Sequence, residues 1–175
     1  KDLLASAPIS DTGCSGAVND DVPLGVDLNG KLFFGCGSDG VDRVCASTGT
    51  PAGTTVLASF LPNYYPRHFT VAGGVGYFAS NYFNPPFEGG FLFKTNGVAG
   101  VTLLGDVGGT IVETLGIGNT AFFVVYPGTL WKSSGSAATT VQLRDFNPSG
   151  QLAYLTELTN LNGTLMFQVA YSGSQ

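Results

Sequence analysis

Short apolar runs, separated by segments rich in Gly, Pro, Asn and Ser, recur along the whole chain. Four of these runs end in an aromatic residue, and successive ends are 44 or 45 residues apart, at Phe34, Phe78, Phe123 and Phe167. A second apolar run precedes each of them, within residues 22–28, 67–72, 111–117 and 153–161. Equal spacing of this kind indicates a tandem repeat of supersecondary units.

One repeat is expected to hold four strands, over residues 32–36, 43–47, 55–60 and 68–72, joined by turns. Several strands are apolar at every position, such as Ala121-Phe-Phe-Val-Val125, which is typical of strands buried on both faces. Four-stranded antiparallel units of about 45 residues are the blades of β-propellers. The predicted fold is therefore all-β, a β-propeller-like array of about four repeats.

The repeat divides the chain into one domain, 1–175, with a partial blade over 1–30 and blades over 31–74, 75–119 and 120–162. Residues 163–175 hold the first strand of a last blade, and residues 1–7 read as a strand like the one that ends at Asp145. This count leaves one blade lacking a strand. Three explanations are open: the chain is a segment of a longer repeat protein, a neighbouring copy supplies the strand, or one blade is short.

Composition supports an all-β chain and excludes two classes of partner. Gly accounts for 26 of 175 residues, and only 11% of residues are charged. The net charge is −5 and the seven Lys and Arg residues are scattered, so no nucleic-acid-binding patch is expected. No apolar run approaches the roughly 18 residues of a membrane-spanning helix. A weakly charged surface rich in Ser, Thr, Asn and Gly predicts an extracellular or cell-surface location.

A recurring motif carries a family resemblance. Leu130-Trp-Lys-Ser-Ser-Gly-Ser-Ala-Ala-Thr-Thr-Val, with Lys94-Thr-Asn-Gly and the Asn-Gly-x-Leu segments at Asn29 and Asn162, resembles the ELWxxDGT repeat. The resemblance covers most of residues 28–169, but the Trp is retained once, at Trp131, and the Asp of the motif is replaced each time. Proteins of this family are mostly large, bacterial and extracellular, with a propeller-like fold expected. The resemblance implies fold and location rather than an activity.

The three cysteines include one candidate disulfide. Cys36 and Cys45 flank a turn-rich segment centred between Gly40 and Val41, so a symmetric hairpin would place them opposite one another. The alternative is two buried free thiols. Cys14 is the odd cysteine, able to pair between chains or to displace one of the others.

Candidate ligand sites are few. Asp2, Asp106 and Asp145 recur at equivalent points of the repeat, and a ring of such carboxylates could hold calcium; the alternative is that each caps its own turn. The sole histidine, His68, has no partners for a metal or catalytic set and is expected to be structural. No catalytic residue and no cofactor other than calcium is predicted. Asn162 begins an N-glycosylation sequon.

Aromatic residues gather at one insert, 81–90, which is expected to be a loop. Its Tyr82, Phe83 and Phe87, with Tyr64 and Tyr65 nearby in sequence, offer a contact site for sugars or protein neighbours, or else pack on the blade. The function predicted from the sequence is a non-enzymatic extracellular structural module, a building block of a filament or surface layer whose partner is itself. The alternative is a carbohydrate- or calcium-binding, lectin-like propeller, with glycans as the partner.

Overall fold

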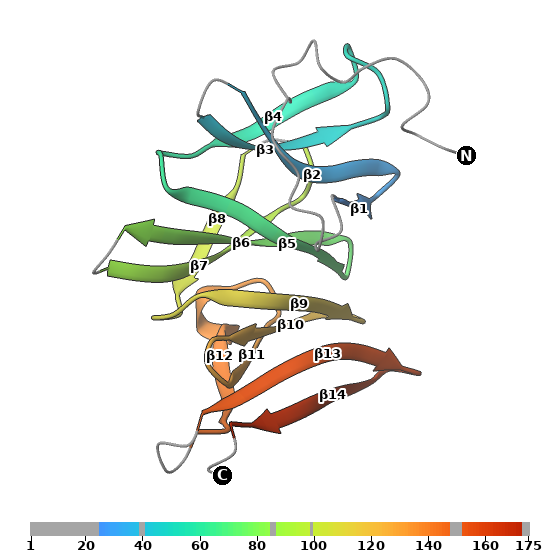
Figure 1. Ribbon diagram of the computed structural model, residues 1–175. Helices are drawn as coiled ribbons and strands as arrows, with labels where there is room; N and C mark the ends of the chain where they lie inside the picture. The colour runs from blue at the N-terminus through green and yellow to red at the C-terminus, as the bar shows by residue number, and fades with distance from the viewer. Residues whose placement is uncertain (1–24, 39–40, 85–86, 99, 148–151, 173–175) are drawn as a thin grey trace.

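A computed structural model describes residues 25–38, 41–84, 87–98, 100–147 and 152–172, and within them the chain is all-β, as predicted (Figure 1). Residues 1–24, with Asp2, Cys14 and the strand predicted at 1–7, lie outside this part. The described strands are β1 (Gly25–Leu28), β2 (Lys31–Ser38), β3 (Val41–Ser47), β4 (Thr54–Ser59), β5 (Tyr64–Ala72), β6 (Val75–Asn84), β7 (Phe87–Thr95), β8 (Thr102–Asp106), β9 (Ile111–Ile117), β10 (Thr120–Val125), β11 (Thr129–Ser133), β12 (Val141–Asp145), β13 (Ala153–Leu161) and β14 (Thr164–Tyr171).

These strands form four antiparallel sheets in chain order. Sheet 1 has the order β1-β2-β3-β4, sheet 2 is β5-β6-β7-β8, sheet 3 is β9-β10-β11-β12, and sheet 4 is the pair β13-β14. Each sheet therefore starts one strand earlier than the units 31–74, 75–119 and 120–162 expected from the sequence, because β5 pairs with β6 and β9 pairs with β10. The 45-residue period is retained, but its starting point differs.

Two-residue turns join the first and second strands of every sheet. They lie at residues 29–30, 73–74, 118–119 and 162–163. In three of them both residues have positive φ, between 52° and 87°. This is the geometry of the type I′ hairpin turn, which matches the twist of the strands and favours Asn and Gly. The Asn-Gly segments of the repeat are thus hairpin turns.

The third strand of each four-stranded sheet ends in a buried hydroxyl side chain. The hydroxyl accepts a hydrogen bond from the N–H of a glycine two residues later, at 3.0 to 3.2 Å. Those glycines have φ between 76° and 92°, a region that side chains with a Cβ rarely adopt. The pairs are Ser47 with Gly49, Thr95 with Gly97 and Ser133 with Gly135. The recurring motif is therefore a turn that closes the third and fourth strands.

The sheets are stacked face to face, and the core lies between them (Figure 1). Leu28, Phe33 and Phe78 belong to a cluster between sheets 1 and 2, where the Phe33 and Phe69 rings meet edge to face at 5.0 Å. Separate clusters fill the space between sheets 2 and 3 and between sheets 3 and 4. The first strands contact one another, β1 with β5, β5 with β9 and β9 with β13. The described sheets do not close into a ring, so the propeller arrangement stays a prediction.

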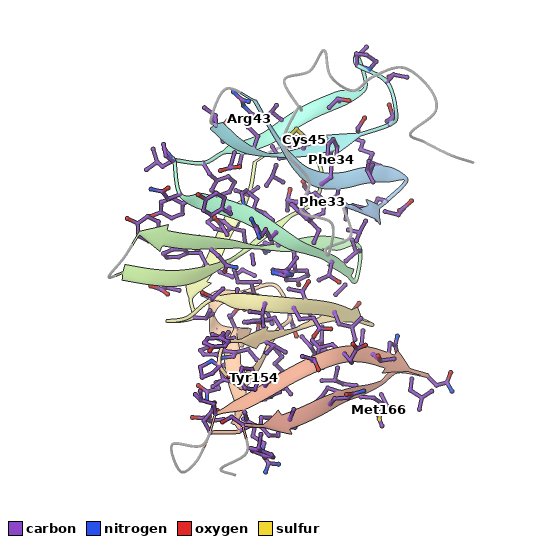
Figure 2. All side chains as sticks on the ribbon, viewed as in Figure 1. Phe33, Phe34, Arg43, Cys45, Tyr154 and Met166 are labelled. Atoms are coloured by element: carbon purple, nitrogen blue, oxygen red, sulfur yellow. A yellow bond between two sulfur atoms is a disulfide. The ribbon has the colours of Figure 1, made fainter. Side chains whose placement is uncertain are left out.

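A disulfide joins Cys36 of β2 to Cys45 of β3, which confirms the predicted bridge (Figure 2). The two residues are not directly opposite, because Cys45 faces Phe34 and Cys36 faces Arg43 in the register of the strands. The bridge is diagonal, with the two Cα atoms 6.0 Å apart. Phe34 packs beside it on one face of sheet 1 while Phe33 enters the core on the other, as expected for a run buried on both faces.

Candidate functional site

One set of contacts links the turns of neighbouring sheets. The side-chain amide of Asn29 donates to the carbonyl of Gly74 at 3.0 Å, and the N–H of Gly73 donates to the carbonyl of Gly118 at 2.7 Å. Both bonds join residues one repeat apart, so the hairpin turns of sheets 1, 2 and 3 form a ladder along one side of the stack. The sequence repeat is therefore matched by repeated hydrogen bonds between neighbouring sheets.

Side chains reinforce this stacking by bonding to the main chain of the next sheet. The amide of Asn81 in β6 donates to the carbonyl of Ile111 at 2.7 Å and accepts from its N–H at 3.0 Å. The hydroxyl of Thr114 donates to the carbonyl of His68 at 2.7 Å. Lys94 reaches from β7 to the carbonyl of Gly135 in the third-to-fourth-strand turn of sheet 3, at 2.6 Å. Polar bonds thus accompany apolar packing at the junction between sheets 2 and 3.

Two residues near these junctions, His68 and Glu113, have shifted pKa values. Burial, assisted by the neighbouring positive charge of Arg67, lowers the pKa of His68 to about 4, so its imidazole is neutral at pH 7. Burial raises the pKa of Glu113, although its carboxylate accepts the N–H of Leu158 in sheet 4 at 2.7 Å. The hydrogen bond described for His68 is made by its main-chain carbonyl, so the structural role of its side chain stays a prediction.

The candidate calcium ligands lie apart in the outer strands. Asp106, at the end of β8, accepts the N–H of Gly108 at 2.9 Å, and Asp145, at the end of β12, accepts the N–H of Asn147 at 2.8 Å. Each carboxylate therefore caps the turn that follows it, which was the expected alternative to a calcium-binding ring. Among the described residues no group of three or more His, Cys, Asp or Glu side chains is placed to hold a metal ion. Asp2 lies outside the described residues.

The aromatic insert at 81–90 is a strand extension and not the loop expected from the sequence. The strands β6 and β7 continue to pair as far as Asn84 and Phe87. Tyr64 packs against Tyr82, with ring centroids 4.8 Å apart, and against Phe91 at 5.9 Å. The side chains of Phe83 and Phe87 lie outside the described part. Tyr64, Tyr82 and Phe91 therefore contact one another on paired strands.

Tyr65 remains 37% exposed, and the guanidinium of Arg67 lies 5.5 Å from the centre of its ring. A second exposed aromatic site was missed by the sequence analysis. Tyr126, at the end of β10, is 50% exposed and lies 6.2 Å, between ring centroids, from Tyr154 of β13, which is 38% exposed (Figure 2). Tyr154 stands two repeats after Tyr65, so an alignment of the first strands would have found it. Exposed tyrosines thus recur at the start of first strands.

Sheet 4 differs from the other sheets at its edge. The strands β2, β6 and β10 each pair with a neighbour on both sides, whereas β14 pairs only with β13 among the described residues. Its Leu165, Phe167 and Val169 pack toward sheet 3, and the alternate residue Met166 is 48% exposed on the opposite face (Figure 2). Asn162 lies in the exposed turn before β14, where a sequon would be accessible.

Searches for related proteins give no further guide to function. Comparisons with protein-family models, with curated proteins and with solved structures found no significant match. No helix in the described part of the chain has the length and apolar character needed to cross a membrane. The geometry of the stacked sheets is therefore the main evidence on function.

Proposed function

We propose that the chain is a non-enzymatic, extracellular structural module, built as a propeller-like array of sheets, that associates with further copies of itself in a filament or surface layer. The observation that carries this proposal is the edge of β14, which pairs only with β13 among the described residues, whereas the equivalent strands of the other three sheets are paired on both sides. An unpaired strand edge presents N–H and C=O groups in a row and favours pairing with another chain.

Three features support this proposal. The contacts between first strands and the ladder of turns repeat from sheet to sheet, so the same packing can be extended. Propeller blades gather their first strands near a common axis, and the contacts of β1 with β5, β5 with β9 and β9 with β13 support such an arrangement. The disulfide between Cys36 and Cys45 is typical of proteins in oxidising, extracellular compartments.

The experiment that tests the proposal is sedimentation velocity of the purified chain over a hundredfold range of concentration, followed by negative-stain electron microscopy. We expect species larger than the 18.1 kDa protomer that grow with concentration, and elongated particles on the grid. A single 18.1 kDa species at every concentration would contradict self-association.

A second candidate function is carbohydrate binding, which the exposed pair Tyr126 and Tyr154 favours. Tyrosine rings present an apolar face and a hydroxyl, which suits neutral sugars, and few charges lie on this chain. A glycan array probed with the wild-type chain and with Tyr154→Ala, with and without calcium, tests it. Binding that is lost in Tyr154→Ala supports this function, and an array without any bound glycan removes it.

A further inference from the structure

The fourth strands of sheets 1, 2 and 3 share an irregularity that allows their environments to be compared. In each, one extra residue interrupts the pairing with the third strand, and it is always leucine: Leu57, Leu104 and Leu143. Leu57 is 6% exposed and Leu104 is 3% exposed, because each lies in the core between its own sheet and the next. Leu143, in sheet 3, is 44% exposed. Within the described part of the chain, nothing equivalent to the surface that covers Leu57 and Leu104 therefore lies over Leu143.

Lys132 lies in the same sheet as Leu143 and also differs from its equivalent in the preceding sheet. Lys94 of sheet 2 donates to the carbonyl of Gly135, which lies in the turn between the third and fourth strands of sheet 3. Lys132 holds the equivalent position in sheet 3, directly after Trp131 as Lys94 follows Phe93. The corresponding turn of sheet 4 is absent from the described residues, where sheet 4 has two strands. Lys132 therefore has no glycine carbonyl equivalent to that of Gly135 within this part of the chain.

As far as the structure describes the chain, the edge of β14, Leu143 and Lys132 together border an uncovered region beside sheet 4, which we call the open slot. The slot continues the apolar interface that Leu130 and Phe146 of sheet 3 already form with β13 and β14. In sheets 1 to 3 the third and fourth strands occupy the corresponding place. The slot thus fits paired β-strands that add to β14 and turn an apolar face toward sheet 3.

We propose that strands of a second copy of this chain occupy the open slot. This inference rests on the proposed function and names its surface. Each copy carries both halves of such a contact: β14 pairs on one side only among the described residues, and so do the outer strands β4, β8 and β12, as well as the first strands of the four sheets. These outer strands also carry exposed apolar side chains, with Val56 46% exposed and Leu103 52% exposed. Burying these side chains together with Leu143 would favour the contact.

A contact between β14 of one copy and an outer strand of the next joins two different surfaces, so it is heterologous. Heterologous contacts form a closed ring where the rotation between copies closes and a filament where it does not. Electron microscopy of the assembled chain distinguishes these two outcomes.

Light scattering of the full chain and of three lysine variants tests the inference. Met166→Lys places a charge beside the edge of β14, a device that discourages strand addition, and Leu143→Lys places one on the uncovered face. The matched control is Leu61→Lys, since Leu61 is 72% exposed in the connection between sheets 1 and 2. We expect both slot variants to raise the dissociation constant about tenfold or more, and the control to leave it unchanged.

The outcomes separate the two proposals. Association that weakens in both slot variants and not in Leu61→Lys supports the inference. Association that persists unchanged in both slot variants overturns the inference; self-association then stands, but the edge of β14 no longer supports it. A wild-type chain that is monomeric throughout overturns both. Circular dichroism spectra that match the wild type ensure that a loss of association does not reflect unfolding.

Discussion

The junction between sheets 2 and 3 is most directly tested by replacing Asn81 with alanine. The Asn81 side chain makes two hydrogen bonds to the main chain of Ile111, one through its amide N–H at 2.7 Å and one through its carbonyl at 3.0 Å. Ile111 is 0% exposed, in the core between the two sheets. The amide therefore satisfies both main-chain groups of Ile111, and alanine removes both bonds at once.

The expected loss follows from the cost of leaving buried main-chain groups unpaired. A typical hydrogen bond contributes about 1 kcal/mol net, while an unsatisfied buried donor or acceptor costs about 1–3 kcal/mol. Two such groups on Ile111 would cost about 2–6 kcal/mol if fully buried. Because the site is only partly buried, water offsets part of this cost, and the expected loss in the free energy of unfolding is about 2–4 kcal/mol.

Urea unfolding followed by the fluorescence of Trp131 is the assay, because this single tryptophan packs against the core between sheets 2 and 3. The matched control is Asn96→Ala: Asn96 is exposed and its side-chain oxygen accepts one local bond, from the N–H of Val98. We expect the control to lose less than about 1 kcal/mol and both variants to keep the wild-type urea dependence. Equal losses in the two variants would refute the inter-sheet role of Asn81.

Three further predictions concern stability. Leu104→Ala should lower the free energy of unfolding by about 2–5 kcal/mol in urea titrations, because Leu104 is 3% exposed. The same change at the equivalent, exposed Leu143 should lower it by less than about 1 kcal/mol. Similar losses in the two variants would contradict the difference in burial. The double variant Cys36→Ser, Cys45→Ser should lose about 2–3 kcal/mol by the chain-entropy estimate, and a reducing agent should no longer affect its melting temperature. Folding lowers the pKa of His68 from 6.5 to about 4, so between these pH values the unfolded chain binds more protons than the folded chain. The free energy of unfolding should therefore fall as the pH decreases from about 6.5 to 4. In a pH series of thermal melts, His68→Asn should flatten this slope.

The sequence predicted where the strands lie better than it predicted which strands belong to one sheet. The all-β class follows from the apolar runs around Phe34 and Phe123 and the scarcity of charge. The disulfide between Cys36 and Cys45 was also predicted, but the two residues were expected to lie directly opposite and the bridge is diagonal. A repeat period does not reveal where a sheet begins, since any strand can be taken as the first. The two-residue Asn29-Gly30 turn held that information, because such a turn joins strands of one sheet.

The candidate sites were harder to predict because they depend on contacts between repeats. The carboxylates of Asp106 and Asp145 recur in the sequence, yet each is used by its own turn. The insert that contains Tyr82 looked like a loop, although residues rich in aromatic side chains also favour paired strands. The difference between Leu104 and Leu143 is invisible in the sequence, because both are leucines at the same point of the repeat.

Amide hydrogen exchange along β14, measured at low and high protein concentration, tests the central claim most directly. The claim is that a second copy completes sheet 4, so the exchange of amides in Thr164–Tyr171 should slow as concentration rises, while exchange in β2, β6 and β10, paired on both sides, should not change. Exchange along β14 that is the same at both concentrations would contradict the claim.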